Sequence, residues 1–249
     1  MVQRNISYAQ NFEDALIKRC FAENTSGTYI DIGSYHPVHD SVTKIFYDVG
    51  WTGINIEANP TLIDEFVTQR PRDINLNLMV GQNSTGFGSL VVPLQNKGLG
   101  KAINTTQNTN NPINQIRTYK VPNRTLTDII VDFNFEKVDF LKIDIEGEEL
   151  SAIKGLDFNL CSPKIVIIEI FDGKYDAVNI NAINNEMASH NYSLVYCDGI
   201  NNFYLFNEQL SWAKFFKYPI NILDNYMKYS EFCLMQENIH LKNISNITS

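Results

Sequence analysis

The stretch that decides the fold reads Thr28-Tyr29-Ile30-Asp31-Ile32-Gly33-Ser34-Tyr35-His36-Pro37. An apolar, β-branched run leads into Asp31 and breaks at Gly33, and the segment 41–49 then shows apolar residues at helical spacing. This pattern predicts a strand, a turn and a helix. In open parallel sheets, ligands bind beyond the carboxyl ends of the strands, so we expect a binding site at this turn.

Two acidic residues end the first two predicted strands. Asp31 can accept hydrogen bonds from the ammonium or hydroxyl groups of a ligand. Glu57 closes the next predicted strand, 53–57, where nucleotide-type sites place an acid that pairs with ribose hydroxyls. Gly33 lets the backbone turn tightly and approach a ligand. The alternative is that both acids only cap turns.

Composition bounds the class of protein. The chain has 249 residues, enough for one α/β domain with a real core. Its formal net charge of -8 disfavours a broad nucleic-acid or anionic-membrane surface. It has no apolar run long enough to span a bilayer, and its first residues do not resemble a signal peptide. The four cysteines are scattered, which predicts reduced thiols in the cytoplasm and no zinc site.

The remaining chain alternates predicted helices and strands. We predict a helix over 8–21, and later strands over 74–80, 138–145, 165–170, 192–196 and 203–206, the last two forming a hairpin. Between them, 81–100 holds one short strand, and the polar segment 104–114 is a mobile loop, a lid or a solvated surface loop. The pattern predicts an α/β fold, a mostly parallel sheet with one antiparallel strand.

The motifs, taken in order, resemble the FkbM family of S-adenosylmethionine (SAM)-dependent methyltransferases. The matching stretches are Ser7-Tyr8-Ala9-Gln10-Asn11-Phe12-Glu13-Asp14, the first turn 29–37, the segment 46–60, Arg70-Pro71-Arg72-Asp73-Ile74-Asn75-Leu76-Asn77, and Asp139-Phe140-Leu141-Lys142-Ile143-Asp144-Ile145-Glu146-Gly147-Glu148-Glu149. The likeness runs from about Ser7 to the Asp198-Gly199 hairpin. It implies one Rossmann-like, class I methyltransferase domain, with a seven-stranded, mostly parallel sheet, a C-terminal antiparallel hairpin and helices on both faces.

The resemblance also divides the chain. It implies an N-terminal helical segment (1–27) over the cofactor site, a Rossmann-like core (28–207), a C-terminal helical segment (208–237) and a frayed tail (238–249). The aromatic stretch 212–232 either forms a homodimer surface or covers the core of its own domain.

The resemblance assigns a set of cofactor residues. Asp31, Gly33 and Ser34 would hold the methionine end of SAM, Glu57 the ribose hydroxyls, Ala58 and Gln82 the adenine, and Tyr8 and Gln10 would close over the cofactor. The first turn lacks the G-x-G-x-G of many methyltransferases and has Ser34-Tyr35-His36 instead. Side chains must therefore hold part of the methionine end.

The acceptor is expected at the strand end Lys142-Ile143-Asp144-Ile145-Glu146-Gly147. By period two, Asp144 and Glu146 would point to the same side and serve as a catalytic base or hold a divalent ion. The alternative is that Glu146 caps the next helix and Asp144 pairs with Lys142. Asp144 also borders the cofactor, and Lys142 and Glu169 are candidates to bind the acceptor.

His36 is a second candidate base, because imidazole titrates near neutral pH. The alternative is a turn histidine that is hydrogen-bonded to the backbone.

These residues predict an O-methyltransferase that acts on a sugar hydroxyl, in a surface polysaccharide or a glycan precursor; the sugar follows only from the resemblance. A nicotinamide-dependent oxidoreductase is the rival enzyme, but the absence of G-x-G-x-x-G and the closing hairpin argue against it. A glycosyltransferase with a metal site at 144–146 is a weaker rival. A SAM-binding interaction module without catalysis is the non-enzyme alternative.

Overall fold

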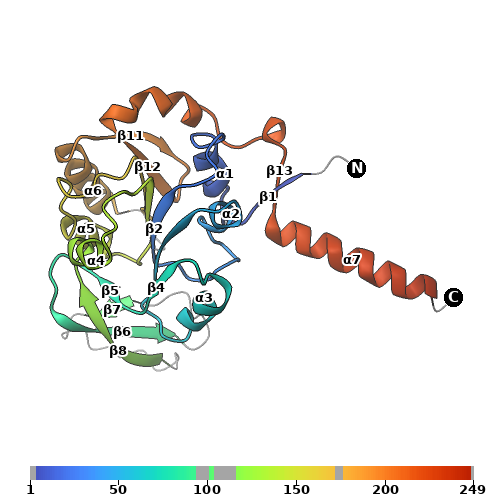
Figure 1. Ribbon diagram of the computed structural model, residues 1–249, viewed down its shortest axis with the longest axis horizontal. Helices are drawn as coiled ribbons and strands as arrows, with labels where there is room; N and C mark the ends of the chain where they lie inside the picture. The colour runs from blue at the N-terminus through green and yellow to red at the C-terminus, as the bar shows by residue number, and fades with distance from the viewer. Residues whose placement is uncertain (1–3, 94–100, 104–115, 172–175, 248–249) are drawn as a thin grey trace.

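The fold is built on a seven-stranded sheet (Figure 1). The computed structural model describes residues 4–93, 101–103, 116–171 and 176–247. In the order β11-β12-β10-β9-β2-β3-β4, the strands are Tyr192–Cys197, Asn201–Phe206, Ile165–Glu169, Phe140–Ile143, Thr28–Ile32, Thr52–Ile56 and Ile74–Leu76. Strands β4, β3, β2, β9 and β10 are parallel, and β12 is antiparallel to both of its neighbours. The predicted sheet and closing hairpin are confirmed.

Helices cover both faces of this sheet, as predicted. On one face, α1 (Glu13–Lys18) and α2 (Lys44–Asp48) pack in an aromatic cluster with Tyr29, Trp51 and Phe140. On the other face, α4 (Leu126–Phe133), α5 (Glu149–Lys154) and α6 (Ala177–Ser189) pack on an aliphatic cluster. Strand β10 is buried on both faces, so its near-continuous Ile and Val run belongs to an interior parallel strand.

The N-terminal segment differs from its prediction. A short strand, β1 (Asn5–Ser7), pairs in parallel with β13 (Tyr226–Lys228) near the other end of the chain. The helix predicted over 8–21 begins only at Glu13, because Phe12 has a left-handed backbone with φ 66°. Helical spacing of apolar side chains cannot reveal such a break.

A second sheet was not predicted. The strand expected over 74–80 is split, with β4 in the main sheet and β5 (Met79–Val80) in a sheet of order β5-β8-β6-β7. The other strands are β6 (Gly86–Pro93), β7 (Lys101–Ile103) and β8 (Ile116–Arg124). Among the described residues, β6 and β8 contribute Leu90, Val92 and Val121 to a small buried cluster, and their sequences lack a long apolar run. The polar segment 104–114 lies outside the described residues.

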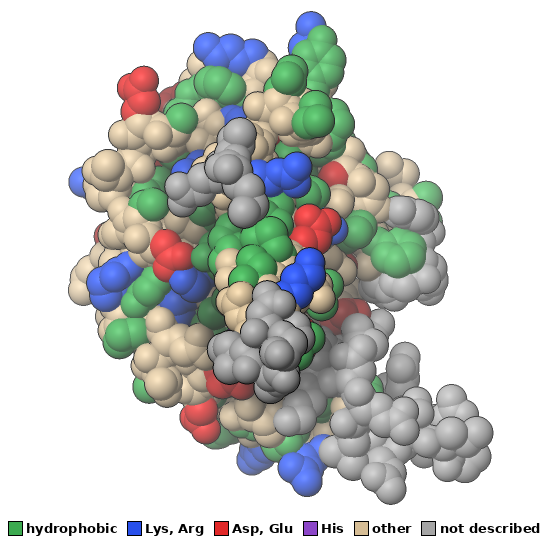
Figure 2. All heavy atoms as spheres, turned by 90° about the vertical axis from the view of Figure 1, so that its right-hand side faces the viewer, with side chains coloured by type: hydrophobic (Ala, Val, Ile, Leu, Met, Phe, Trp, Pro, Cys, Tyr) green, Lys and Arg blue, Asp and Glu red, His purple; other side chains and the backbone are tan. Residues whose placement is uncertain are grey.

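The C-terminal segment also differs from its prediction. Two 3₁₀ segments, η1 (Asn207–Phe216) and η2 (Ile222–Asp224), precede α7 (Tyr229–Ile247), which projects from the body of the molecule (Figure 1). The chain expected to fray from 238 continues α7 as far as Ile247. The face that carries α7 intersperses acidic, basic and hydrophobic side chains (Figure 2). Among the described helices, none has the length and apolar character needed to cross a membrane.

One more helix, α3 (Ile63–Gln69), follows β3 and leads into the segment Arg70–Asp73. The Phe66 side chain of α3 is fully buried. It anchors the end of α3 and so the start of the segment Arg70–Asp73.

Candidate active site

The register of the sheet brings three candidate residues and Asn201 together at its carboxyl edge. The residues Gly33, Asp144, Glu169 and Asn201 lie in one row across β2, β9, β10 and β12. Gly33 has φ +75°, and a Cβ placed there would lie 1.7 Å from the carbonyl oxygen of Asp144. Glycine therefore permits the first turn to touch the end of β9; the tight turn was predicted from the sequence, whereas this contact with β9 was not.

Asp31 is buried beneath this turn. Its Oδ2 accepts a hydrogen bond from the Thr43 hydroxyl at 3.2 Å, and its Oδ1 lies 3.8 Å from the Lys142 ammonium. No described residue donates a hydrogen bond to Oδ1. Burial raises the pKa of the Asp31 carboxyl, against the opposing effect of Lys142. A buried carboxylate oxygen without a donor fits the ammonium at the methionine end of SAM.

Glu57 holds the first turn in place. Its Oε2 accepts the backbone N–H of Tyr35 at 3.0 Å, and its Oε1 accepts that of Asn59 at 2.7 Å. Tyr35 has φ +55°, so the carboxylate stabilises a strained residue. Each carboxylate oxygen can accept a second hydrogen bond, so these contacts are compatible with binding ribose hydroxyls. Ala58 packs beside the β6–β8 cluster.

The other predicted cofactor residues spread over a wider area. Ser34 donates its hydroxyl to the Ile56 carbonyl at 3.3 Å, and the Gln82 N–H donates to the Ser151 hydroxyl of α5 at 3.1 Å. Tyr8 packs on Tyr229, with ring centroids 5.0 Å apart. The Gln10 carbonyl accepts a hydrogen bond from Lys228.

Tyr8 also lies beside the start of α2. The Lys44 ammonium lies 5.1 Å from the centre of the Tyr8 ring, and Lys44 follows the Thr43 that binds Asp31. The N-terminal segment therefore lies close to the helix that begins above the first turn.

Asp144, Lys142 and Glu169 form one cluster. The Lys142 ammonium lies 2.9 Å from Asp144 Oδ2, and the carboxyl groups of Asp144 and Glu169 are hydrogen-bonded to each other. Burial, and then this hydrogen bond, raise the pKa of Glu169 to about 10. Burial would raise the pKa of Asp144, but Lys142 and the Glu169 hydrogen bond lower it. The two opposite pKa shifts favour the shared proton on Glu169 and the negative charge on Asp144.

The pairing predicted for Asp144 and Glu146 is wrong in its geometry. Strand β9 ends at Ile143, and Glu146 lies in a turn with φ 57°, so the period-two argument does not extend to it. The turn is instead closed by Glu149, whose Oε1 accepts the N–H groups of Ile145 and Gly147 at 3.1 and 3.0 Å. Within the described part of the chain, no group of three His, Cys, Asp or Glu residues is arranged to hold a metal.

His36 shapes its own turn. Its Nδ1 accepts the backbone N–H groups of Val38 and His39, both at 2.9 Å, and its Nε2 lies 3.1 Å from Glu65. Burial lowers the pKa of the imidazole. Both ring nitrogens are engaged, as in the turn-histidine alternative.

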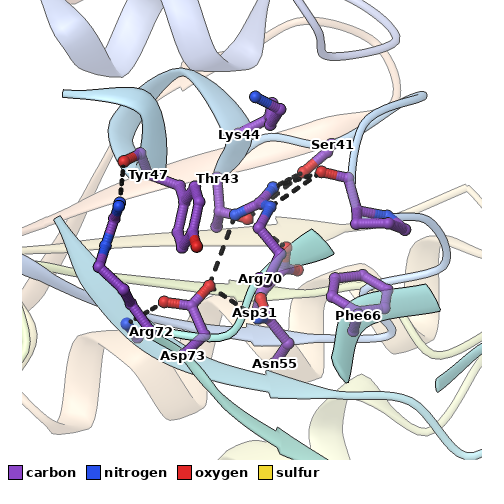
Figure 3. A network of polar contacts seen from close by, with 12 residues as sticks. Asp31, Ser41, Thr43, Lys44, Tyr47, Asn55, Phe66, Arg70, Arg72 and Asp73 are labelled. Atoms are coloured by element: carbon purple, nitrogen blue, oxygen red, sulfur yellow. Dashed lines mark hydrogen bonds and ion pairs between the residues drawn. The ribbon is translucent and has the colours of Figure 1, made fainter. Parts of the chain in front are cut away.

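Sequence reasoning assigned no role to Arg70 and Asp73, which support the first turn from below (Figure 3). The Arg70 guanidinium is fully buried and donates to the Pro37 carbonyl at 2.9 and 2.7 Å and to the Ser41 hydroxyl at 2.9 Å. Asp73 lies 3.5 Å from Arg70 and accepts the Tyr29 hydroxyl at 2.6 Å. The network fixes the loop 37–41. The matching motif at 70–77 was its only sequence signal.

A pocket of about 400 Å³ opens beside Glu169, between α5, β10 and α6. Its lining combines apolar and polar side chains: Leu150, Ile170, Phe171, Val178, Ala182, Glu149, Glu169, Asp176 and Asn179, with Gly147. Because Glu169 also contacts Asp144, the pocket adjoins the carboxyl cluster.

Comparison with known proteins gives the family of the chain. A solved structure, described as a putative caffeoyl-CoA O-methyltransferase from Staphylococcus aureus, is similar to the chain, with a TM-score of 0.44 and 11% sequence identity. The alignment covers 80% of this chain and 84% of that one. No curated protein sequence is similar enough to count as a relative. The family profile of the Methyltransferase FkbM domain matches residues 31–194, and the chain therefore belongs to the FkbM methyltransferase family.

Proposed function

We propose that the chain is an O-methyltransferase that transfers a methyl group from SAM to a hydroxyl of a sugar, in a surface polysaccharide or a glycan precursor. Family membership supports SAM-dependent methylation in general. The observation that carries the proposal further is the contact of Asp144 with Lys142 and Glu169, beside a pocket that Glu169 lines. An ionised carboxylate beside a neutral acid is suited to binding a hydroxyl and removing its proton.

The cofactor would bind across the ends of β2 and β3. Asp31 would pair with its ammonium, Gly33 and Ser34 would border its methionine end, and Glu57 would accept its ribose hydroxyls. Ala58 and Gln82 would border the adenine, while Tyr8 and Gln10 would close over the site. When bound, SAM supplies an electrophilic methyl group, and cleavage of the C–S bond leaves S-adenosylhomocysteine (SAH).

The residues of the chain would activate the acceptor. Asp144 would take the hydroxyl proton as the oxygen forms its bond to the methyl carbon, and Lys142 would keep Asp144 ionised until then. Glu169, whose proton is shared with Asp144, would accept a hydrogen bond from a neighbouring hydroxyl of the acceptor and so orient it. We assign the base to Asp144 rather than to His36, because both His36 ring nitrogens already have partners.

The composition of the pocket supports a sugar as the acceptor. Phe171, Leu150 and Val178 offer apolar surface to the C–H face of a ring, whereas Asp176 and Asn179 offer polar groups to its hydroxyls. A cleft of this size that combines apolar surface with polar groups suits a small molecule that carries both, as a sugar does.

Calorimetric titration with SAH, with NADH as the comparison, tests the cofactor. We expect SAH to bind, Glu57→Gln to weaken its binding, and NADH to give no heat. Binding of NADH without SAH would support the oxidoreductase instead.

Transfer of labelled methyl groups from SAM to bacterial polysaccharides tests the reaction. Asp144→Asn should abolish transfer and keep SAH binding, whereas the exposed control Glu23→Gln should change neither. Wild-type rates in Asp144→Asn would refute the proposed base.

A further inference from the structure

Glu13 is a buried acid that takes no part in the proposed chemistry, and it links the N-terminal segment to β12. Glu13, the first residue of α1, is only 5% exposed. Its Oε1 accepts a hydrogen bond from the Asn201 side chain at 3.1 Å, and its Oε2 accepts the backbone N–H of Asn11 at 2.7 Å. Burial raises the pKa of Glu13 to about 7. Burying an acid is unfavourable, so these contacts must compensate for it.

The contact with Asn201 places Glu13 beside the row of residues at the carboxyl edge of the sheet, Gly33, Asp144, Glu169 and Asn201. Asn201 pairs with Glu169 in the sheet register and is itself 4% exposed. Asp198 holds it in place by accepting its backbone N–H at 2.6 Å and its side-chain amide at 3.2 Å. The Asn201 side-chain amide is thus fixed next to Glu169, which is proposed to bind the methyl acceptor, and it donates a hydrogen bond to Glu13.

The contact with Asn11 fixes the other side. Asn11 lies in the loop between β1 and α1, where Phe12 has a left-handed backbone. The neighbouring acid, Asp14, accepts hydrogen bonds from Ser7, Tyr8 and Ala15. Those bonds stay within the N-terminal segment, whereas the Glu13 carboxylate joins that segment to β12, 188 residues away in the sequence.

We propose that Glu13 is a positioning residue for methyl transfer. Its carboxylate holds the segment 8–12 against the start of β12. Tyr8 and Gln10 then keep a fixed position relative to Glu169. This inference rests on the proposed function, because it gives Tyr8 and Gln10 the task of closing over the cofactor. Glu13 itself touches neither the reacting atoms nor the proposed base.

The test combines Glu13→Ala, Glu13→Gln, Asn201→Ala and the double variant Glu13→Ala with Asn201→Ala, with exposed Glu23→Ala as the control. Hydrogen exchange of residues 8–12 and 198–202 reports the link without any cofactor. SAH titration and steady-state kinetics report its effect on the site.

In Glu13→Ala, we expect faster exchange in both segments and a rise of about tenfold in the SAH Kd and the KM for SAM, because hydrogen bonds to a charged group are lost. The change in kcat should stay below about threefold. The double variant should be no worse than Glu13→Ala, since both changes break one link. Glu13→Gln keeps the shape and one acceptor oxygen, and should recover part of the affinity; it carries the test if Glu13→Ala does not fold.

Three outcomes would overturn the proposal. Unchanged SAH affinity and KM in a Glu13→Ala protein of lowered Tm would make the role structural only. Additive effects of the two changes in the double variant would contradict the proposed link between Glu13 and Asn201. A wild-type protein that exchanges slowly in both segments but binds no SAH would overturn the proposed function together with this inference, which separates that failure from the first two.

Discussion

Replacing Gly33 by Ala tests the contact on which the site depends. Gly33 has φ +75°, and its added Cβ would meet the Asp144 carbonyl oxygen at 1.7 Å. That oxygen belongs to the backbone, so the clash cannot be relieved by turning a side chain. The first turn and the end of β9 would have to move apart by more than an ångström, taking Asp31 and Asp144 with them.

The magnitude follows from two terms. A left-handed alanine costs about 1–2 kcal/mol relative to glycine. Overpacking against a fixed neighbour adds about 1–3 kcal/mol. We therefore expect Gly33→Ala to lower the free energy of unfolding by about 2–5 kcal/mol, the sum of these two terms, and to weaken SAH binding more than tenfold.

The chain offers a matched control at Gly86. It has φ +81°, but a Cβ placed there would meet no atom within 4 Å. Gly86→Ala should therefore lose only the backbone term, about 1–2 kcal/mol, and bind SAH as the wild type does. Urea unfolding of both variants and SAH titration give the comparison. Equal losses of stability, or wild-type SAH affinity in Gly33→Ala, would refute the close approach of the turn to β9.

Three further variants test other parts of the molecule. Arg70→Met leaves Asp73 buried without its cation, so the free energy of unfolding measured by urea titration should fall by about 3–5 kcal/mol. An unchanged urea midpoint would contradict the role of this network. Thr125→Ala removes the α4 N-cap, whose hydroxyl accepts the Asp128 N–H at 3.0 Å, and should cost about 1 kcal/mol in the same assay without changing SAH binding. Glu13 has a raised pKa, so the folded state binds its proton more tightly and stability falls as pH rises from about 4.5 to about 7. Glu13→Gln should remove up to about 3 kcal/mol of that pH dependence, measured as unfolding free energy against pH; an identical slope would contradict it.

Local sequence patterns predicted the parts of the fold that depend on local chemistry. Buried parallel strands such as 165–170 and the glycine at position 33 follow from periodicity and backbone freedom. The β6–β8 ribbon could not be predicted in the same way, because it buries few side chains. Phe12, directly before α1, and Glu146, in the turn after β9, are left-handed, and no change in hydrophobic pattern marks either position.

Part of the candidate site could be predicted for a similar reason. Asp31 lies near the end of β2, and Glu57 and Asp144 directly follow β3 and β9; such strand ends can be recognised in the sequence. Arg70 and Glu13 act through partners that only the tertiary fold brings near them. The separation of 188 residues between Glu13 and Asn201 leaves no trace in local spacing.

The charges at the sheet edge connect the proposed cofactor and the proposed base. Lys142 is one cation that lies within 3.8 Å of both Asp31 and Asp144, while Glu169 shares a proton with Asp144. One ammonium cannot satisfy three neighbouring acids, which agrees with the pKa of Glu169, raised by burial and by Asp144, and with the absence of a described donor to Asp31 Oδ1. A ligand with an ammonium and a sulfonium, as SAM has, is the electrostatic complement of this cluster. If the ammonium of SAM pairs with Asp31, Lys142 can interact with Asp144 alone. Binding of the cofactor would then favour the ionised form of Asp144, the proposed base.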